Sequence, residues 1–479
     1  MKDNKQFKLA SFFSQNTIKH LLKEIQETYK CNNYPWVIGY SGGKDSTATV
    51  QLVWYALAEL PLSERSKPVY IISSDTLVET PVVVKQINTT LRLIQENAAQ
   101  LEMPIIIQKV TPTVEDTFWV RMIGMGYSAP TKRFRWCTDR MKIKPANTFI
   151  LETAAHFGEV MMVLGARKSE SMSRAQVMNK REFLPGTHLS RHSSLSRAWV
   201  YTPIENFTTD DVWTYLLQVP SPWGGNNRDL AAMYRSTQSG ECPLVVDSST
   251  PSCGNSRFGC WVCTVVEKDR MMQSLIDNGE EWMEPLLDFR EKLAETQIPE
   301  RKHEFRDFKR RNGKTIVKDG KLIPGPYLPE IRQRLLRDLL QLQTRVQKDG
   351  PDPDMVLITQ AELHEIRRIW RSELSDWADT VPQIYREVTG QELSWVEDEG
   401  GAFTSREYSI IEEESSLNGA PTQLVTRLID LERQMQGMGR RSGIYSEIHR
   451  IFEEEWGSES EVLEKAALEH TRQMELGLG

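Results

Sequence analysis

The sequence has no long apolar run, and this absence sets the first limits on its function. Nowhere in its 479 residues is there a stretch of about 18 consecutive apolar residues, the length that a membrane-spanning helix needs. The first residues, MKDNKQF, also lack the apolar core of a secretory signal. We therefore expect a cytoplasmic protein with no membrane partner.

The chain also has a small net charge and few cysteines. The net charge of −7 excludes a surface that is basic throughout, so any contact with nucleic acid must come from a local groove. Six cysteines are present, and four of them fall within residues 242–263. Because a reducing cytoplasm does not maintain a disulfide framework, this clustering points to metal or redox chemistry.

The most informative feature that is present is a glycine turn between an apolar strand and a helix. Residues 36–46 read WVIGYSGGKDS, and a run of helical character follows. Adjacent glycines let the backbone turn tightly around an anion, and the amides at the start of the next helix point towards it. The lysine adds a mobile positive charge. We therefore expect nucleotide phosphates to bind at Ser41, Gly42, Gly43, Lys44, Asp45 and Ser46.

This turn resembles the PP-loop of the ATP pyrophosphatases. A Walker loop would be longer and would end in Gly-Lys-Ser/Thr, whereas here the lysine is followed by Asp45 and Ser46. The resemblance implies an adenine nucleotide alpha hydrolase-like α/β domain with a mostly parallel sheet. It also implies that ATP is cleaved between its α and β phosphates, with Mg²⁺ and Lys44 stabilising the departing pyrophosphate and Asp45 positioning the metal.

Further apolar runs alternate with helical segments, as in a parallel sheet with crossover helices. A helix is expected over residues 14–30, and further strands over 68–75, 104–111 and 160–165. Ligands bind beyond the carboxyl ends of such strands. The strand ends therefore add Ser74, Asp75 and Gly165 to the expected nucleotide site.

An arginine and a single cysteine lie near these strand ends. Arg167 follows the fourth expected strand, and its forked cation suits phosphate; an ion pair with Glu170 and no ligand is the alternative. Residues 131–145, TKRFRWCTDRMKIKP, surround Cys137 with six Lys and Arg. Basic neighbours favour a thiolate, so Cys137 is a candidate reactive or ligating sulfur, with a buried structural cysteine as the alternative. Arg140, Lys142 and Lys144 are equally suited to phosphate.

Four thiols spaced C-x10-C-x6-C-x2-C form the last chemical motif. Four thiolates can enclose a zinc ion or an iron–sulfur cluster. Structural zinc usually uses two short pairs, whereas this block has one Cys-x-x-Cys, and its prolines, glycines and Trp261 suit a larger pocket. We therefore expect a 4Fe-4S cluster, with zinc or unliganded thiols as alternatives, at Cys242, Cys253, Cys260 and Cys263.

Together, the glycine turn, the Cys137 segment and residues 165–174 and 203–215 resemble the phosphoadenosine phosphosulfate reductase-like branch of the PP-loop superfamily. Those reductases carry a catalytic cysteine in a C-terminal tail, and no cysteine follows Cys263 here. Sulfonucleotide reduction is therefore not expected.

The cysteine block narrows the resemblance. Residues 240–245 (GECPLV) and 251–266 (PSCGNSRFGCWVCTVV), with RWCTDR at 135–140, are similar to the DndC family of the bacterial DNA phosphorothioation system. The resemblance implies an iron–sulfur ATP pyrophosphatase that adenylylates a DNA backbone phosphate, so that sulfur replaces a non-bridging oxygen. Its implied partners are DNA, a cysteine desulfurase as sulfur donor, and DndD- and DndE-like subunits. The catalytic residues would be Lys44, Asp45, Cys137 and Arg167.

Two other functions compete with this one. An iron–sulfur PP-loop tRNA thiolase combines the same nucleotide loop with a cluster and sulfurates a base. A nucleotide-sensing scaffold without turnover is the other, although the intact Lys44, Asp45 and Ser46 speak against it.

The expected organisation has four parts: the PP-loop domain with its N-terminal helix (1–235), the iron–sulfur segment (236–270), a basic region of helices and turns (271–350) and a C-terminal helical domain (351–479). Residues 301–321 carry nine Lys and Arg against three acids, which suits contact with DNA phosphates; a solvated basic helix is the alternative. The C-terminal helices are expected to dock a partner or cap the core, or to be a solvated extension of it.

Overall fold

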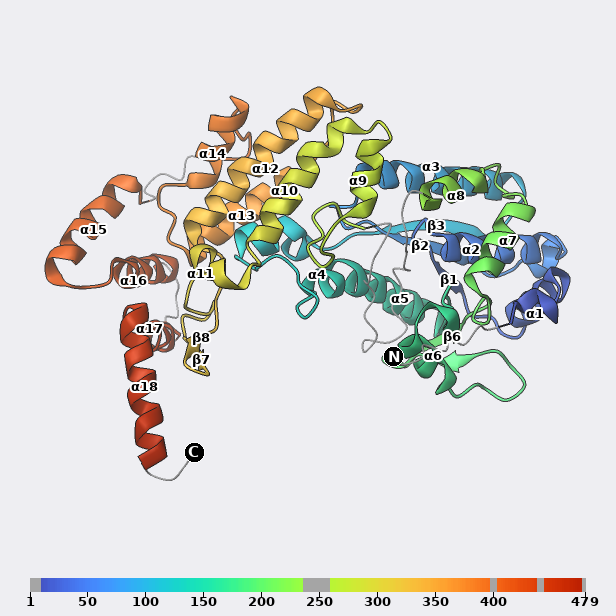
Figure 1. Cartoon of the computed structure of the whole chain (residues 1–479), viewed down its shortest axis with the longest axis horizontal. Coiled ribbons are helices and arrows are strands. Elements are labelled where there is room, and N and C mark those ends of the chain that lie inside the picture. Colours follow the sequence, from blue (N-terminus) through green and yellow to red (C-terminus); the bar gives the residue numbers. More distant parts are fainter. Residues whose placement is uncertain (1–9, 236–258, 397–402, 437–442, 476–479) are drawn as a thin grey trace, which may run out of the picture. The chain divides into compact units, whose positions relative to one another are not determined.

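The computed structural model describes residues 10–235, 259–396, 403–436 and 443–475, which fold into two compact units (Figure 1). Unit 1 is Met1–Thr113 with Pro130–Leu287, and unit 2 is Val114–Ala129 with Asp288–Gly479. The chain therefore enters unit 2 twice. The division at residues 235, 270 and 350 stays a prediction.

Unit 1 is built on a six-stranded sheet in the order β3-β2-β1-β4-β6-β5. β1 pairs in parallel with β2 and β4, while β5 runs antiparallel to β6. The predicted α/β fold with a mostly parallel sheet is confirmed. Two strands, β5 and β6, were not predicted. β5 has two residues, too few to show a strand period, whereas β6 has four, the same length as β1 and β4. The strands are β1 (Trp36–Gly39), β2 (Val69–Ser74), β3 (Ile105–Val110), β4 (Val160–Val163), β5 (Ser190–Arg191) and β6 (Ala198–Tyr201).

Helices cover both faces of this sheet. In β1, Trp36 and Ile38 join an apolar cluster with α1, α2 and α3, whereas Val37 joins a second cluster with α5. This alternation gives the three-layer packing of a parallel sheet. The helices of unit 1 are η1 (Phe12–Ser14), α1 (Ile18–Lys30), α2 (Lys44–Ala58), η2 (Leu62–Glu64), α3 (Pro81–Gln100), α4 (Trp136–Thr138), η5 (Asp139–Ile143), α5 (Lys144–Phe157), η6 (Lys168–Glu170), α6 (Met172–Asn179), α7 (Thr209–Gln218), α8 (Asn227–Arg235), α9 (Arg270–Asp277) and η7 (Glu281–Met283).

Unit 2 is mainly helical, as predicted for the C-terminal region. Its first segment is held by two indoles: Trp119 donates to the carbonyl of Leu357 at 2.6 Å, and Trp370 donates to that of Ile123 at 3.0 Å. The elements are η3 (Val114–Asp116), η4 (Val120–Gly124), α10 (Glu284–Glu295, which begins in unit 1), η8 (Pro299–Arg301), α11 (Lys302–Phe305), β7 (Val317–Lys318), β8 (Lys321–Leu322), α12 (Pro329–Asp349), α13 (Gln360–Glu373), α14 (Thr380–Thr389), α15 (Ser405–Asn418), α16 (Thr422–Met435), α17 (Ile444–Phe452) and α18 (Glu459–Glu475).

The basic residues 301–321 do not form one solvated helix. Helix α11 ends at Phe305, and a loop and the β7–β8 hairpin follow. The loop lies directly against the chain at Gly325, where a Cβ atom would stand 1.6 Å from the carbonyl oxygen of Lys309. This close backbone packing fixes the loop that carries Lys309, Arg310 and Arg311.

Across the described ranges, no helix is both long enough and apolar enough to span a bilayer.

Candidate functional site

The glycine turn lies where the strand order of the sheet reverses. β1 has β2 on one side and β4 on the other, which is the switch point at which α/β sheets bind ligands. Gly42 has a φ of +72°, and a Cβ atom there would stand 2.6 Å from Cγ1 of Ile87. Gly43 caps α2, so the positive end of the α2 dipole lies at this crevice. The local structure is the strand, turn and helix that a phosphate cradle requires.

Serine hydroxyls hold the turn in shape. The Ser46 hydroxyl accepts from the amide of Ser41 at 3.2 Å and donates to the carbonyl of Gly43 at 3.0 Å. The hydroxyls of Ser41 and Ser46 lie 3.2 Å apart. The two serines thus join the start of α2 to the end of β1.

Asp45 gathers two cations at the same edge. Its carboxylate lies 2.8 Å from Nζ of Lys44 and 2.7 Å from Nε of Arg167. The three residues are only 6%, 8% and 2% exposed, in the order Lys44, Asp45 and Arg167. Both carboxylate oxygens therefore orient cations, which would meet the phosphates of a nucleotide. The role of Asp45 as an Mg²⁺ ligand stays a prediction, and it would require the carboxylate to release one cation.

Gly165 explains how Arg167 reaches the turn. A Cβ atom at Gly165 would stand 2.8 Å from the carbonyl oxygen of Asp45 and 2.9 Å from Oγ1 of Thr49. Only glycine lets the end of β4 pack so closely against the first turn of α2. The structure therefore joins this predicted residue directly to the glycine turn.

The alternative pairing of Arg167 with Glu170 is not the one that forms. The Arg167 guanidinium binds Asp45 and donates to Oγ of Ser169 at 2.7 Å. Glu170 instead accepts the backbone amide of Arg167 at 2.9 Å and pairs with Arg174. Burial raises the pKa of Glu170. Glu170 thus holds the backbone at Arg167 and leaves the guanidinium to Asp45.

The other predicted strand-end residues stand one strand further along. Ser74 ends β2 and is buried, and Asp75 follows it. Asp75 lies 3.6 Å from Lys109 of β3 and accepts the amide of Leu77 at 3.0 Å. These residues share the carboxyl edge of the sheet with the glycine turn, but Asp75 is directed towards β3.

The described end of the cysteine block folds against the loop after β2. The amide of Trp261 donates to the carbonyl of Val78 at 3.0 Å, and the Thr80 hydroxyl donates to that of Gly259 at 3.0 Å. The amide of Cys263 donates to the carbonyl of Cys260 at 3.0 Å, which closes a tight turn. This turn therefore stands at the same edge of the sheet as the glycine turn.

The predicted metal site is described only in part. Cys242 and Cys253 lie outside the described residues, and within the described ranges no group of three or more His, Cys, Asp or Glu residues is arranged to hold a metal. Burial raises the pKa of the Cys260 thiol, whose sulfur lies 3.4 Å from Oγ1 of Thr76. Two thiols on a tight turn fit one half of a four-thiolate set, and the 4Fe-4S cluster stays a prediction.

The basic segment around Cys137 reaches the same loop. Lys142 lies 3.6 Å from Glu79, and Glu79 forms an isolated β-bridge with Cys260. Burial raises the pKa of the Glu79 carboxyl. Cys137 itself is partly exposed on α4. The loop after β2 thus connects the basic segment to the cysteine turn.

Two residues of this region were not predicted as site residues. The hydroxyl of Tyr234, on α8, accepts the backbone amide of Lys44 at 3.0 Å, and its ring lies 5.4 Å from Nζ of Lys44. A contact between residues 190 positions apart leaves no local sequence signal. Arg135 has two buried guanidinium nitrogens with no hydrogen-bond partner in the described chain, beside Cys137. The sequence signal that could have indicated Arg135 was its position within the basic segment 131–145.

Comparisons with known proteins agree with this architecture. Residues 35–265 match the model of the phosphoadenosine phosphosulfate reductase domain. Two uncharacterized proteins of Methanocaldococcus jannaschii are similar. MJ0066 is 25% identical over 247 residues, which is 52% of this chain and 40% of that protein. MJ0973 is 22% identical over 196 residues, 41% of this chain and 39% of that protein. The chain thus spans well under half the length of these relatives.

Two solved structures have a weaker likeness. Phosphoadenylyl-sulfate reductase from Candida auris, in a phosphate complex, is 18% identical with a TM-score of 0.26, covering 43% of this chain and 87% of that one. The U34-tRNA thiolase NcsA from Methanococcus maripaludis, with its 4Fe-4S cluster, is 14% identical with a TM-score of 0.28, covering 58% and 80%. Likenesses this weak assign no activity. The domain match, the strand order and the glycine turn agree on an α/β PP-loop fold for residues 35–265.

Proposed function

We propose that the chain is the ATP-using sulfurtransferase component of DNA phosphorothioation. One observation carries this proposal: the Cys260–Cys263 turn packs on the loop after β2, at the strand edge that also holds the glycine turn. An enzyme that activates an oxygen with ATP and then replaces it with sulfur needs both chemistries at one edge. Resemblance of the cysteine block to the DndC family supplies DNA as the substrate.

In the first step, a non-bridging oxygen of a DNA phosphate attacks the α phosphorus of ATP. A new P–O bond forms, the bond between the α and β phosphates breaks, and pyrophosphate leaves. Lys44, Arg167 and the positive end of the α2 dipole would stabilise the negative charge that develops on the phosphates. Mg²⁺ arriving with ATP would neutralise further charge on the pyrophosphate.

In the second step, a sulfide attacks the activated DNA phosphorus. A P–S bond forms, the P–O bond to AMP breaks, and AMP leaves. Arg135, two of whose buried nitrogens have no hydrogen-bond partner among the described residues, is suited to hold the DNA phosphate beside Cys137. Cys242, Cys253, Cys260 and Cys263 would hold a 4Fe-4S cluster, which would supply electron-transfer chemistry when bound. The proposal includes a cysteine desulfurase and DndD- and DndE-like subunits as partners.

Mass spectrometry of nuclease-digested host DNA tests the proposal. Phosphorothioate dinucleotides are expected in strains that carry the intact chain together with its partner subunits. They should disappear with Lys44→Ala, which removes the ammonium proposed to meet the phosphates, and with Cys263→Ala, which removes a thiol of the Cys260–Cys263 turn. Both variants should still accumulate as folded protein.

Two matched substitutions control for loss of charge and of a thiol. Lys30→Ala removes an exposed lysine of α1, and Cys31→Ala removes an exposed cysteine next to it. Both should keep the modification. Unmodified DNA in the complete strain, together with thionucleosides in tRNA that depend on Lys44, would reject DNA as the substrate and establish the tRNA thiolase.

A further inference from the structure

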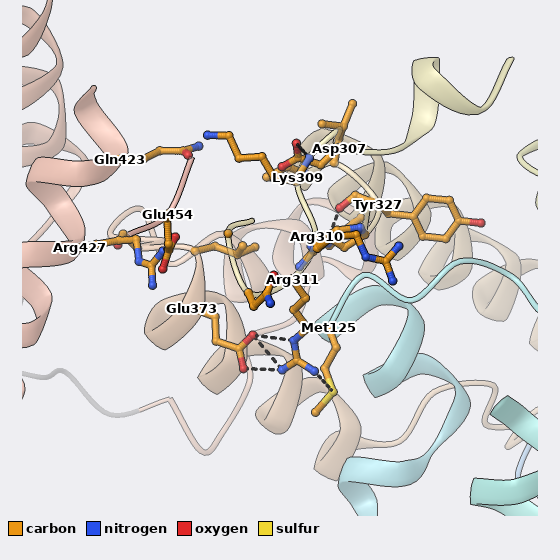
Figure 2. A pocket seen from close by; sticks show the side chains of 18 of the residues that line it. Met125, Asp307, Lys309, Arg310, Arg311, Tyr327, Glu373, Gln423, Arg427 and Glu454 are labelled. Carbon is orange, nitrogen blue, oxygen red and sulfur yellow. Dashed lines mark hydrogen bonds and ion pairs between the residues drawn. The ribbon is translucent and has the colours of Figure 1, made fainter. Parts of the chain in front are cut away.

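Unit 2 contains a pocket of about 540 Å³, a size common among small-molecule sites (Figure 2). Its wall is built from the loop 307–313, the start of α12, the end of α13, and residues of α16 and of the chain around α17. With Met125, six segments of the chain therefore meet at one cavity. We propose that this pocket binds a phosphate group, from the DNA backbone or from a free phosphate compound.

Cations outnumber carboxylates in the pocket wall, and most of the carboxylates are already engaged. Arg311 forms a forked pair with Glu373 at 2.7 and 3.0 Å, and Arg427 pairs with Glu454 (Figure 2). Asp307 accepts the amide of Lys309 at 2.9 Å. The lining cations are Lys309, Arg310, Arg311, Arg332, Arg427 and Arg450, and the lining carboxylates are Asp307, Glu330, Glu373 and Glu454.

Two of these cations are held by carbonyl oxygens. Arg332 is 4% exposed and donates to the carbonyls of Tyr327 at 2.7 Å and Gly124 at 3.0 Å. Arg310 donates to the carbonyl of Pro324 at 2.8 Å. Within the described chain, no carboxylate lies within ion-pair distance of either guanidinium. Carbonyl dipoles orient these cations without neutralising them, so their positive field remains for an anion.

Arg332 stays charged despite its burial. Burial lowers the pKa of Arg332 to about 10, which is still far above neutral pH. A Cβ atom at Gly126 would stand 2.4 Å from a guanidinium nitrogen of Arg332, so the backbone closes tightly around this cation. An anion in the pocket would therefore meet a cation that is already desolvated and fixed, which lowers the cost of binding.

The remaining wall adds two features that suit phosphate. Nζ of Lys309 lies 5.2 Å from the ring centroid of Trp456, and Lys309 forms no ion pair within the described ranges. Helix α12 has 21 residues and begins at the pocket with no side-chain cap, so the positive end of its dipole lies in the wall. Phosphate, with several acceptor oxygens, can use all these donors at once.

The test is DNA binding by the full chain with its partner subunits, measured by fluorescence anisotropy on a labelled 20-base-pair duplex over a range of salt concentrations. The double substitution Lys309→Gln and Arg450→Gln removes two positive charges of the pocket wall. Unlike Arg310 and Arg332, these side chains donate to no backbone carbonyl in the described chain. The double substitution should weaken binding about tenfold, as for loss of hydrogen bonds to a charged group, and make the salt dependence shallower. Lys309→Arg with intact Arg450 should retain binding.

A second double substitution, Arg345→Gln with Lys348→Gln, removes the same charge from an exposed face of α12 outside the pocket. It should change the affinity less than twofold. Equal weakening by both pairs would overturn the pocket, because general charge would then explain the binding.

Thermal protection by inorganic phosphate and by AMP distinguishes the two sources. If the pocket substitutions, but not the control pair, abolish this protection and leave the DNA affinity unchanged, the pocket binds a free phosphate compound. If neither DNA affinity nor protection depends on the pocket, the proposal is wrong. The DNA source rests on the proposed function, which the phosphorothioate measurement tests separately through Lys44 and Cys263.

Discussion

The glycine-turn edge of unit 1 and the pocket of unit 2 gather cations in different ways. At the edge, Lys44 and Arg167 share one buried carboxylate, Asp45, and regular elements hold all three residues. In the pocket, Arg310 and Arg332 rest on backbone carbonyls that an irregular loop and a helix start supply. A cluster of cations that shares one carboxylate can form from one motif and one strand end. A carbonyl-held cluster requires several remote segments, and it keeps its charge for a ligand.

The largest expected contrast is between a buried and an exposed ion pair. Arg167→Ala would leave Asp45 buried without its forked partner, which should cost about 3–5 kcal/mol of unfolding free energy and slow ATP cleavage about a hundredfold. Arg311→Ala breaks a pair whose side chains are 39% and 41% exposed, and it should cost less than about 1 kcal/mol. Urea unfolding and pyrophosphate release measure both effects. Similar costs for the two variants would show that burial does not distinguish the pairs.

Substituting one glycine in each unit should again lower the unfolding free energy more in unit 1 than in unit 2. Gly165→Ala would place a Cβ atom 2.8 Å from the Asp45 carbonyl, and such overpacking should lower the unfolding free energy by about 1–3 kcal/mol. Gly443→Ala, in unit 2, is the control, because no atom lies within 4 Å of the added Cβ. Urea unfolding of the two variants makes the comparison. Wild-type stability and ATP cleavage in Gly165→Ala would contradict the close packing of β4 on α2.

Each unit also contains a buried cation that donates to a backbone carbonyl, Lys67 in unit 1 and Arg332 in unit 2. The stabilities of the two units should therefore depend differently on pH. Burial lowers the pKa of Lys67, in unit 1, to about 8, whereas burial lowers that of Arg332 to about 10. Between pH 8 and 10.5 an unfolded lysine keeps its proton while folded Lys67 loses it, so the unfolding free energy of unit 1 should rise with pH. The expected gain from pH 7.5 to 9.5 is about 2 kcal/mol at most, while Arg332 stays charged over most of this range.

Amide hydrogen exchange, measured separately in β1 and in α12, reports the unfolding free energy of each unit. Lys67→Met should remove the rise in unit 1 and leave unit 2 unchanged. A rise that persists in Lys67→Met would assign the pH dependence to another group.

The smallest expected effect concerns the tyrosine over the nucleotide turn. Tyr234→Phe keeps the ring beside Lys44 and Trp213 and removes the hydroxyl that accepts the Lys44 amide. The freed amide becomes available to a phosphate, so ATP should bind a few-fold more tightly, in line with about 1 kcal/mol for one hydrogen bond. Equilibrium binding of ATP measures this change. Weaker binding would instead mean that the hydroxyl contacts the nucleotide.

The sequence predicted the parts of this molecule that are local. Strand, glycine turn and helix are adjacent in the chain, and buried parallel strands appear as apolar runs, so β1 to β4 and the PP-loop fold were predicted correctly. Gly165 was placed at a strand end, although the close contact with Asp45 that makes glycine necessary appears only in three dimensions. The contact of Tyr234 with Lys44 spans 190 positions and could not be anticipated.

The same reasoning explains why the basic stretch 301–321 was harder to interpret. Its charges indicated an anion partner, but composition does not tell which cations pair with acids and which rest on carbonyls. Arg301 pairs with Glu295 and Glu304, whereas Arg310 donates to Pro324. Only the folded loop separates these two groups. The roles of Cys137 and of the four clustered cysteines stay predictions.

The central claim is that the turn at Ser41–Ser46 directs ATP cleavage between the α and β phosphates. The most direct measurement is product analysis of ATP labelled at the α phosphate, incubated with the full chain, its partner subunits and DNA. The account predicts labelled AMP together with pyrophosphate, and loss of both with Lys44→Ala but not with Lys30→Ala. Labelled ADP with free phosphate, or AMP release that is unchanged by Lys44→Ala, would contradict it.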